Sequence, residues 1–250
     1  ADDLFIKLGS LQSTNAAALQ LVEQGSSIEP DLKFKVAQTS VDGQAHATVA
    51  LISSEGSGLF WSGEFQQGQR SVADLRQQLA YSVALVLKCA TGAMAPGRKE
   101  VRDVTLKLYL GGCARFTGGL DEDTGSLVET FEQVVQGAPD FQGAWEKLLI
   151  TETNAFINAD HDPAIGRSLR AHIARARKLN PTMAEAYVAE SWLLELGQVN
   201  DWMALSAVAV SKNPSNVWAL TGRAHDMFQV GRLREGASYA RRAAQEDPLS

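Results

Sequence analysis

The fold is decided by the stretch from Val217 to Pro248, whose sequence is VWALTGRAHDMFQVGRLREGASYARRAAQEDP. Small residues recur in it where two antiparallel helices and their turn must approach closely, at Ala224, Gly231, Gly236 and Ala243. We predict one helix over Val217–Val230, ended by Gly231, because glycine takes a positive φ without the penalty that a Cβ imposes. A second helix is predicted over Leu233–Glu246, and Pro248 stops it because its ring cannot continue a helix.

Similar phrases close earlier copies of this pattern. The segment ARKLNP ends at Pro181, AVSKNP ends at Pro214, and a shorter phrase, QGAP, ends at Pro139. The four closing prolines, including Pro248, are separated by 42, 33 and 34 residues. A repeated spacing in this range is typical of an array of helical pairs.

Ahead of these copies, the pattern predicts the order β-α-β-β-β-α. Strands are predicted over Leu4–Gly9, Asp31–Ser40, Ala45–Ser53 and Leu59–Phe65, and helices over Asn15–Gln24 and Val72–Cys89. Asp42-Gly43 predicts a tight hairpin, because both central residues of a type I′ turn need positive φ. The predicted class is therefore α+β, with a small α/β domain at 1–90, a linker at 91–103, and an all-α helical solenoid at 104–250.

Composition places the chain among soluble globular proteins. It has 250 residues and a net charge of −6, which argues mildly against nucleic acid as a direct partner. No apolar run is long enough for a membrane span. The chain does not begin with Met and stops just after a repeat proline, so we expect it to be part of a longer protein.

Two cysteines, Cys89 and Cys113, stand on either side of the predicted linker. An even pair in this position could form a disulfide that locks the two domains together, which would require an oxidising compartment. The alternative is a pair of buried free thiols. Their spacing fits neither a zinc site nor CxxC redox chemistry.

Motifs for catalysis, cofactors or metals are not found. The sequence has no GxSxG, HExxH, Walker A or GxGxxG. Asp160-His161-Asp162-Pro163 gathers possible ligands, but Asp162 before Pro163 is typical of a helix start, with Asp as N-cap and Pro at the first helical position. We therefore expect no enzyme, no cofactor and no metal site.

The helical pattern resembles the tetratricopeptide repeat (TPR), in which small residues, a turn glycine and a closing proline fall at these offsets. Trp145, Tyr187 and Leu220, each six residues after a closing proline, stand where that family places a bulky residue of its first helix. The resemblance implies a concave groove, lined by the first helix of each pair, that binds a protein or peptide. The positions of this chain that would face it are Glu146, Thr153, Glu185, Trp192, Glu195, Trp218, Thr221, His225 and Phe228. For Trp192 and Phe228, the alternative is packing against neighbouring helices.

The segment before the repeats is similar to the TolB-N-terminal-like α/β module. The strand LFWSGEF at 59–65 and the helix from Val72 carry this resemblance, although the further strand and helix with which the module usually starts are missing. Such modules precede TPRs in ToxR/CadC-like winged-helix transcriptional regulators and in some class III adenylate cyclases. The resemblance implies a periplasmic sensory region of a membrane-anchored regulator, with the anchor outside this chain, and it is compatible with an oligomer. The alternatives are a regulatory region of a cytosolic signalling enzyme, such as an adenylate cyclase, and a free-standing adaptor.

Overall fold

The structure of the chain, a computed structural model, describes residue 27 and residues 29–53, 58–68, 71–94, 101–116, 124–195 and 197–247. The chain divides into two compact units, residues 1–116 and 117–250. A three-stranded sheet is followed by helices, so the predicted α+β class is confirmed. The predicted strand at Leu4–Gly9, the predicted helix at Asn15–Gln24 and residues 95–100 of the predicted linker lie outside the described residues.

The first unit contains an antiparallel sheet in the order β1 (Leu32–Val41), β2 (Gln44–Ser53), β3 (Leu59–Gln66). The β1–β2 hairpin turns at Asp42 and Gly43, whose φ angles are 52° and 77°. Both values are positive, as the type I′ turn predicted from the sequence requires.

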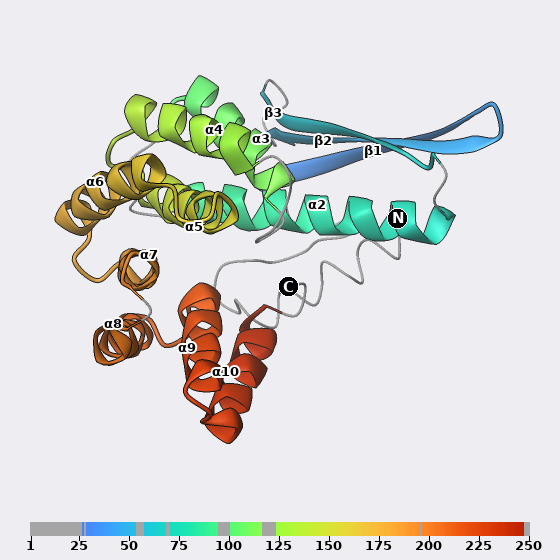
Figure 1. The fold of residues 1–250 in the computed structure, drawn as a ribbon. Coiled ribbons are helices and arrows are strands. Elements are labelled where there is room, and N and C mark those ends of the chain that lie inside the picture. Colours follow the sequence, from blue (N-terminus) through green and yellow to red (C-terminus); the bar gives the residue numbers. More distant parts are fainter. Residues whose placement is uncertain are drawn as a thin grey trace. The chain divides into compact units, whose positions relative to one another are not determined.

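One face of this sheet is apolar because alternate residues of a strand point to the same side. Val49 and Leu51 of β2 are fully buried, and each lies opposite a residue of β3 in the ladder, Leu51 opposite Trp61. The helix α2 (Val72–Ala93) runs along the sheet and buries Leu75 and Val83 (Figure 1).

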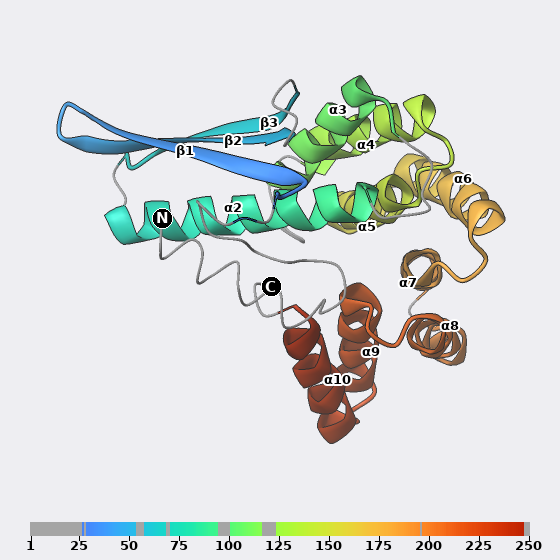
Figure 2. The same cartoon turned by 180° about the vertical axis from the view of Figure 1, so that it is seen from behind.

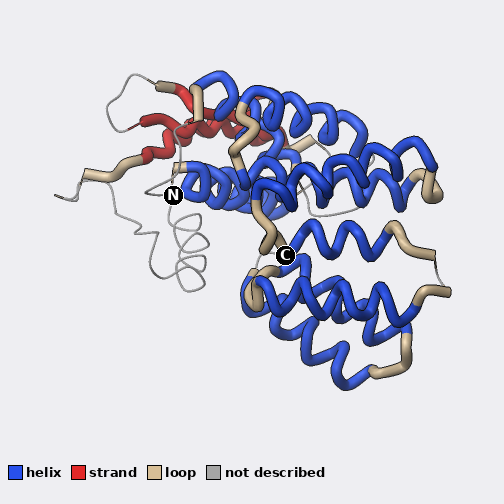
Figure 3. Tube along the Cα trace, turned by 90° about the vertical axis from the view of Figure 1, so that its left-hand side faces the viewer, coloured by secondary structure: helices blue, strands red, loops and turns tan. Residues whose placement is uncertain are grey.

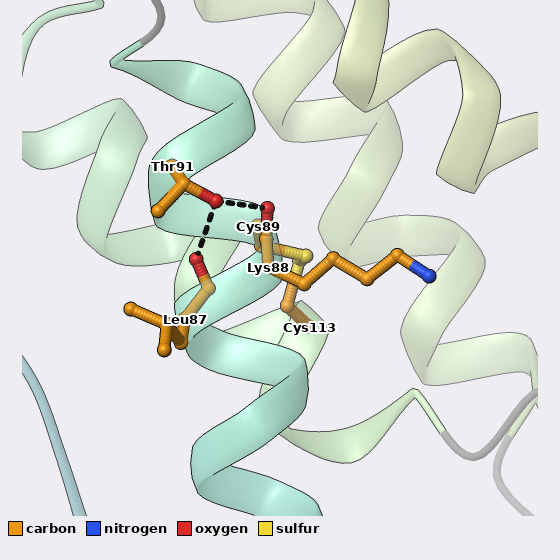
Figure 4. Close-up of a disulfide and its surroundings, with 5 residues drawn as sticks. All are labelled: Leu87, Lys88, Cys89, Thr91 and Cys113. Atoms are coloured by element: carbon orange, nitrogen blue, oxygen red, sulfur yellow. Dashed lines mark hydrogen bonds between the residues drawn. A yellow bond between two sulfur atoms is a disulfide. The ribbon is translucent and has the colours of Figure 1, made fainter. Parts of the chain in front are cut away.

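α2 begins with a side-chain cap and ends with a backbone hydrogen bond from Met94 to the carbonyl of Ala90. Ser71 and Asp74 form a reciprocal capping box at its start. At its other end the helix passes Cys89, its predicted last residue, and continues to Ala93, so residues 91–93, which were predicted to belong to the linker, are helical. The hydroxyl of Thr91 donates to the carbonyl of Leu87 at 2.9 Å (Figure 4), and the burial of Ala93 favours the extra turn despite Gly92 within it.

The helix α3 (Asp103–Arg115) is joined to α2 by a disulfide between Cys89 and Cys113, with Cα atoms 6.5 Å apart (Figure 4). The predicted pairing is therefore present. Both cysteines are buried and belong to the first unit, so the bridge links two helices of that unit.

The second unit is a succession of helices (Figures 2 and 3). They are α4 (Thr124–Gly137), α5 (Gln142–Asn158), α6 (Pro163–Leu179), α7 (Ala184–Trp192), α8 (Val199–Lys212), α9 (Val217–Gln229) and α10 (Leu233–Glu246). α5 contacts α6, α7 contacts α8, and α9 contacts α10, while α7 also contacts α5 and α9. For the copies that end at Pro181, Pro214 and Pro248, this is the arrangement of paired helices that the repeat pattern predicts. The copy that ends at Pro139 differs, because α4 contacts α5 and α3 belongs to the first unit. The bounds of the last pair agree with the prediction to within one residue, and Gly231 between them has a φ of 76°.

The closing prolines help to fix where each pair begins. Trp145 donates its indole N–H to the carbonyl of Pro139 at 2.8 Å, and Tyr187 donates its hydroxyl to that of Pro181 at 2.9 Å. Leu220 holds the equivalent place but has no donor, and there the guanidinium of Arg242 donates to the carbonyl of Pro214 at 3.0 Å. The bulky residue six positions after the proline is therefore tied to the turn before it wherever its chemistry allows.

Candidate functional site

An aromatic contact joins α7 and α9. The ring centroids of Trp192 and His225 lie 5.2 Å apart, with the ring planes 34° apart. Trp192 also packs against a buried cluster of small apolar side chains that includes Val188 and Ala219. The indole is therefore half-buried, whereas the side chain of His225 is 45% exposed.

Polar groups surround the exposed side of His225. The Nε2 atom of the imidazole lies 3.1 Å from the side-chain amide nitrogen of Gln229, and its Nδ1 atom lies 3.8 Å from Oδ1 of Asp226. The other carboxylate oxygen of Asp226, Oδ2, is buried and has no hydrogen-bond partner within the described ranges. A buried acceptor in this state is costly, and because this oxygen is enclosed by the protein it is not part of the accessible surface.

Next to the imidazole, a cavity of about 330 Å³ opens between α9 and α10. It is lined by Val217, Thr221, Ala224, His225, Phe228, Ala240, Ala243 and Ala244. Phe228 is 43% exposed and forms one wall. Its position depends on Gly236 of α10, where an added Cβ would lie 2.5 Å from the Phe228 ring. The alanines that α10 contributes to the lining are apolar. A cavity of this size and lining accommodates one bulky apolar side chain.

Glu185 lies deeper, at the start of α7, and is 6% exposed. The side-chain amide of Asn216, the N-cap of α9, donates to its Oε1 atom at 2.5 Å. Burial raises the pKa of the Glu185 carboxyl, while hydrogen bonds from the backbone and Asn216 and the positive charge of Lys147 act in the opposite direction. This carboxyl connects successive first helices within the unit.

The remaining predicted groove residues are spread over different environments. Thr153 is fully buried, and its hydroxyl donates to the carbonyl of Leu149 at 2.7 Å. Glu146 is half-buried and accepts a hydrogen bond from Gln142 at 3.0 Å. Trp218 packs on the same apolar cluster as Trp192, and Glu195 is exposed. Of the nine positions, the structure brings together Trp192, Thr221, His225 and Phe228 around one surface, and whether any of the nine binds a partner remains a prediction.

Two further features were not predicted from the sequence. The first is a group of possible metal ligands, Glu132, Glu152 and His172, from three successive helices. The second is a cavity of about 600 Å³ within the first unit, beside β3, α2 and α3, whose lining includes Lys107 and Arg115. No local motif marks either one, because their members come together only when distant elements pack.

Among the helices that the structure describes, none combines the length and the apolar character that crossing a membrane requires.

Comparisons with known proteins give distant structural likenesses alone. No family model matches the chain, and no curated protein matches it. Solved structures similar to it include a thermophilic TPR protein of Thermus thermophilus, with 16% identity, a TM-score of 0.48, and coverage of 70% of this chain and 88% of that one. MamA of MSR-1 is similar at 17% identity and a TM-score of 0.33, covering 69% of this chain and 91% of that one. A MamA mutant is similar at 19% identity and a TM-score of 0.32, covering 70% of this chain and 99% of that one. These neighbours are TPR proteins, and likenesses this distant do not say what the chain binds.

The raised pKa of Glu185 predicts a pH dependence of stability. The stabilising contribution of its protonated form is fully present below the unfolded-state pKa and is lost as pH rises through the folded-state pKa. Glu185→Gln keeps an oxygen that can accept the hydrogen bond from Asn216, and it carries no charge. We predict that this variant gains stability relative to the unmodified chain as pH rises from the unfolded-state pKa of Glu185 through its folded-state pKa. Urea unfolding at a series of pH values measures the difference.

Glu195→Gln is the control, because Glu195 is an exposed carboxylate just beyond the same helix. The difference in free energy of unfolding between Glu195→Gln and the unmodified chain should stay nearly constant over this pH range. Parallel pH curves for Glu185→Gln and the unmodified chain would show that Glu185 does not bear the cost of a buried charge.

Proposed function

We propose that this chain is a non-enzymatic protein-binding module, and that a partner segment binds the surface formed by α7, α9 and α10. The observation that carries the proposal is the half-exposed Phe228 wall of an apolar cavity, next to the Trp192–His225 stack. Large aromatic side chains give much contact area with little loss of conformational entropy, and they are frequent at the centres of protein interfaces.

The lining of the cavity suggests the chemistry of the partner. Alanine and valine side chains with one phenyl ring offer dispersion contacts and few polar groups, so the occupant is a bulky apolar side chain. At the rim, His225 and Gln229 can hydrogen-bond to the polar atoms that flank such an anchor. We therefore expect a peptide segment with one aromatic or large aliphatic anchor that is followed or preceded by a polar group.

The cellular setting that we propose is the periplasmic part of a membrane-anchored transcriptional regulator, in which partner binding is passed to an effector domain outside this chain. The Cys89–Cys113 disulfide supports this setting, because such bonds persist in oxidising compartments. The resemblance of the first unit to TolB-N-terminal-like modules points the same way. A regulatory region of a cytosolic enzyme such as an adenylate cyclase, or a free adaptor, is the alternative that reduced cysteines would favour.

The binding surface is tested by Phe228→Asp, which places a charge against the apolar cavity. We predict that peptides selected from a displayed library on the unmodified chain lose affinity for this variant by about 30-fold or more, the loss expected for an interface hot spot. Fluorescence anisotropy of labelled peptides measures the change. Circular dichroism checks that the variant remains folded.

Leu233→Asp is the matched control, because Leu233 is a 63% exposed apolar residue of the same helix pair and is not among the residues lining the cavity. It should leave peptide affinity within about twofold of the unmodified value, as surface substitutions away from a contact usually have little effect. Equal losses in both variants, or none in Phe228→Asp, would place the binding surface elsewhere.

The proposed compartment is tested on chain purified from its native cells without reductant and alkylated before unfolding and again after it. We predict that neither cysteine is labelled, and that the intact mass is lower than that of the dithiol by the mass of two hydrogen atoms. Labelling of both cysteines would remove the support for a periplasmic setting and favour the cytosolic alternatives.

A further inference from the structure

We propose that Glu132, Glu152 and His172 form a binding site for one divalent transition-metal ion, of which zinc is the best fit. Each residue offers one ligand atom, and these atoms all lie within 4.8 Å of one another. They come from α4, α5 and α6 in turn. An ion held here would therefore tie three successive helices of the second unit together.

The centre of the group is Glu152, a carboxylate that is only 2% exposed. Its Oε2 atom lies 2.7 Å from Nδ1 of His172, whose side chain is 13% exposed. The imidazole is held in place by Trp145, with an edge-on ring contact at a centroid distance of 5.9 Å. Two of the three ligands are thus held in position by packing, as a metal site requires.

The formal charges of the group favour a cation. The two carboxylates together carry two negative charges when ionised, and His172 can supply at most one positive charge. Glu132 is half-buried and makes no hydrogen bond or ion pair to any described residue. A divalent ion at the common centre of the three ligand atoms would be attracted by both carboxylates.

The donor types select the ion. Imidazole nitrogen suits zinc, copper, iron and nickel, while carboxylate oxygen suits harder ions as well. Zinc takes nitrogen and carboxylate ligands at about 2.0–2.2 Å, and in a site with three protein ligands water fills the fourth position. With all three ligand atoms on one tetrahedral ion, each pair of them would stand roughly 3.4 Å apart. The hydrogen bond between Nδ1 and Oε2 would open slightly, and Glu132 would close in from the present separation of up to 4.8 Å.

The ion would have a structural role. Each ligand lies on a different helix, and linking them stabilises the folded unit in proportion to metal occupancy. The ligands do not belong to α7, α9 or α10, so this site does not depend on the proposed peptide surface. Failure of one proposal leaves the other standing.

The test uses the whole chain, stripped with a chelator and then titrated with zinc chloride in a calorimeter, with magnesium chloride as the comparison ion. We expect one zinc per chain, no measurable magnesium binding, and an unfolding temperature that rises with zinc concentration. Absence of zinc binding by the folded, stripped chain overturns the proposal.

The deciding variant is Glu132→Gln, because it removes a ligand that makes no hydrogen bond to the described part of the chain and so leaves the fold intact. Zinc affinity should fall at least about tenfold, the lower end of what losing even an outer partner of a metal ligand costs. In chelator, the unfolding temperature of this variant should stay close to that of the unmodified chain, because the changed side chain makes no hydrogen bond to the described part of the chain.

Two controls separate this site from other outcomes. Glu129→Gln removes an exposed carboxylate of the same helix and should leave zinc affinity unchanged. His161→Gln tests the exposed Asp160-His161-Asp162 group and should also bind zinc normally. If His161→Gln abolishes binding, or if Glu132→Gln binds zinc as the unmodified chain does, Glu152 and His172 form an ion pair beside Glu132 and the three residues are no metal site.

Discussion

The second unit depends on small side chains at the positions where two helix backbones approach. Ala184, Ala209 and Ala219 are at most 1% exposed and form the apolar cluster on which Trp192 and Trp218 pack. Gly236 gives the ring of Phe228 its place, because any Cβ there would overlap it. Larger residues at these positions would separate the helices, and close packing leaves little room for such a change. The aromatic stack and the cavity beside it are consequences of this close approach.

Much of the fold follows from local rules, and for that reason the sequence predicts it well. The Asp42-Gly43 turn needs positive φ at both residues, Asp162 caps a helix whose first residue is Pro163, and Gly231 ends α9 with a positive φ. The closing prolines mark the helix pairs because a proline cannot continue a helix. The cysteine pairing was one of two hypotheses, and it forms because α2 packs against α3 and brings the two Cα atoms to 6.5 Å.

Features that depend on tertiary packing were not predictable in the same way. α2 continues through Gly92 because Ala90 and Ala93 are buried, which outweighs the low helix propensity of glycine. The repeat pattern predicted that Thr153 and Glu185 lie on the side of the first helix of each pair that faces a partner. Both side chains are buried. The pattern indicates which face of a helix a residue occupies, but not how deeply its side chain is buried. Glu132, Glu152 and His172 follow one another at intervals of 20 residues, and no single-helix or strand period would bring them together.

The most direct test of a partner surface on α7, α9 and α10 is an NMR titration of the ¹⁵N-labelled chain with a selected peptide. The titration is monitored through the indole N–H signals of the five tryptophans. Binding at this surface should shift the signal of Trp192, which stacks on His225, and leave that of Trp61, in the sheet of the first unit, unchanged. Assignment by single Trp→Phe variants identifies each signal. The proposed site would be contradicted if the titration saturates while the indole N–H signal of Trp192 keeps its chemical shift and that of Trp61 changes.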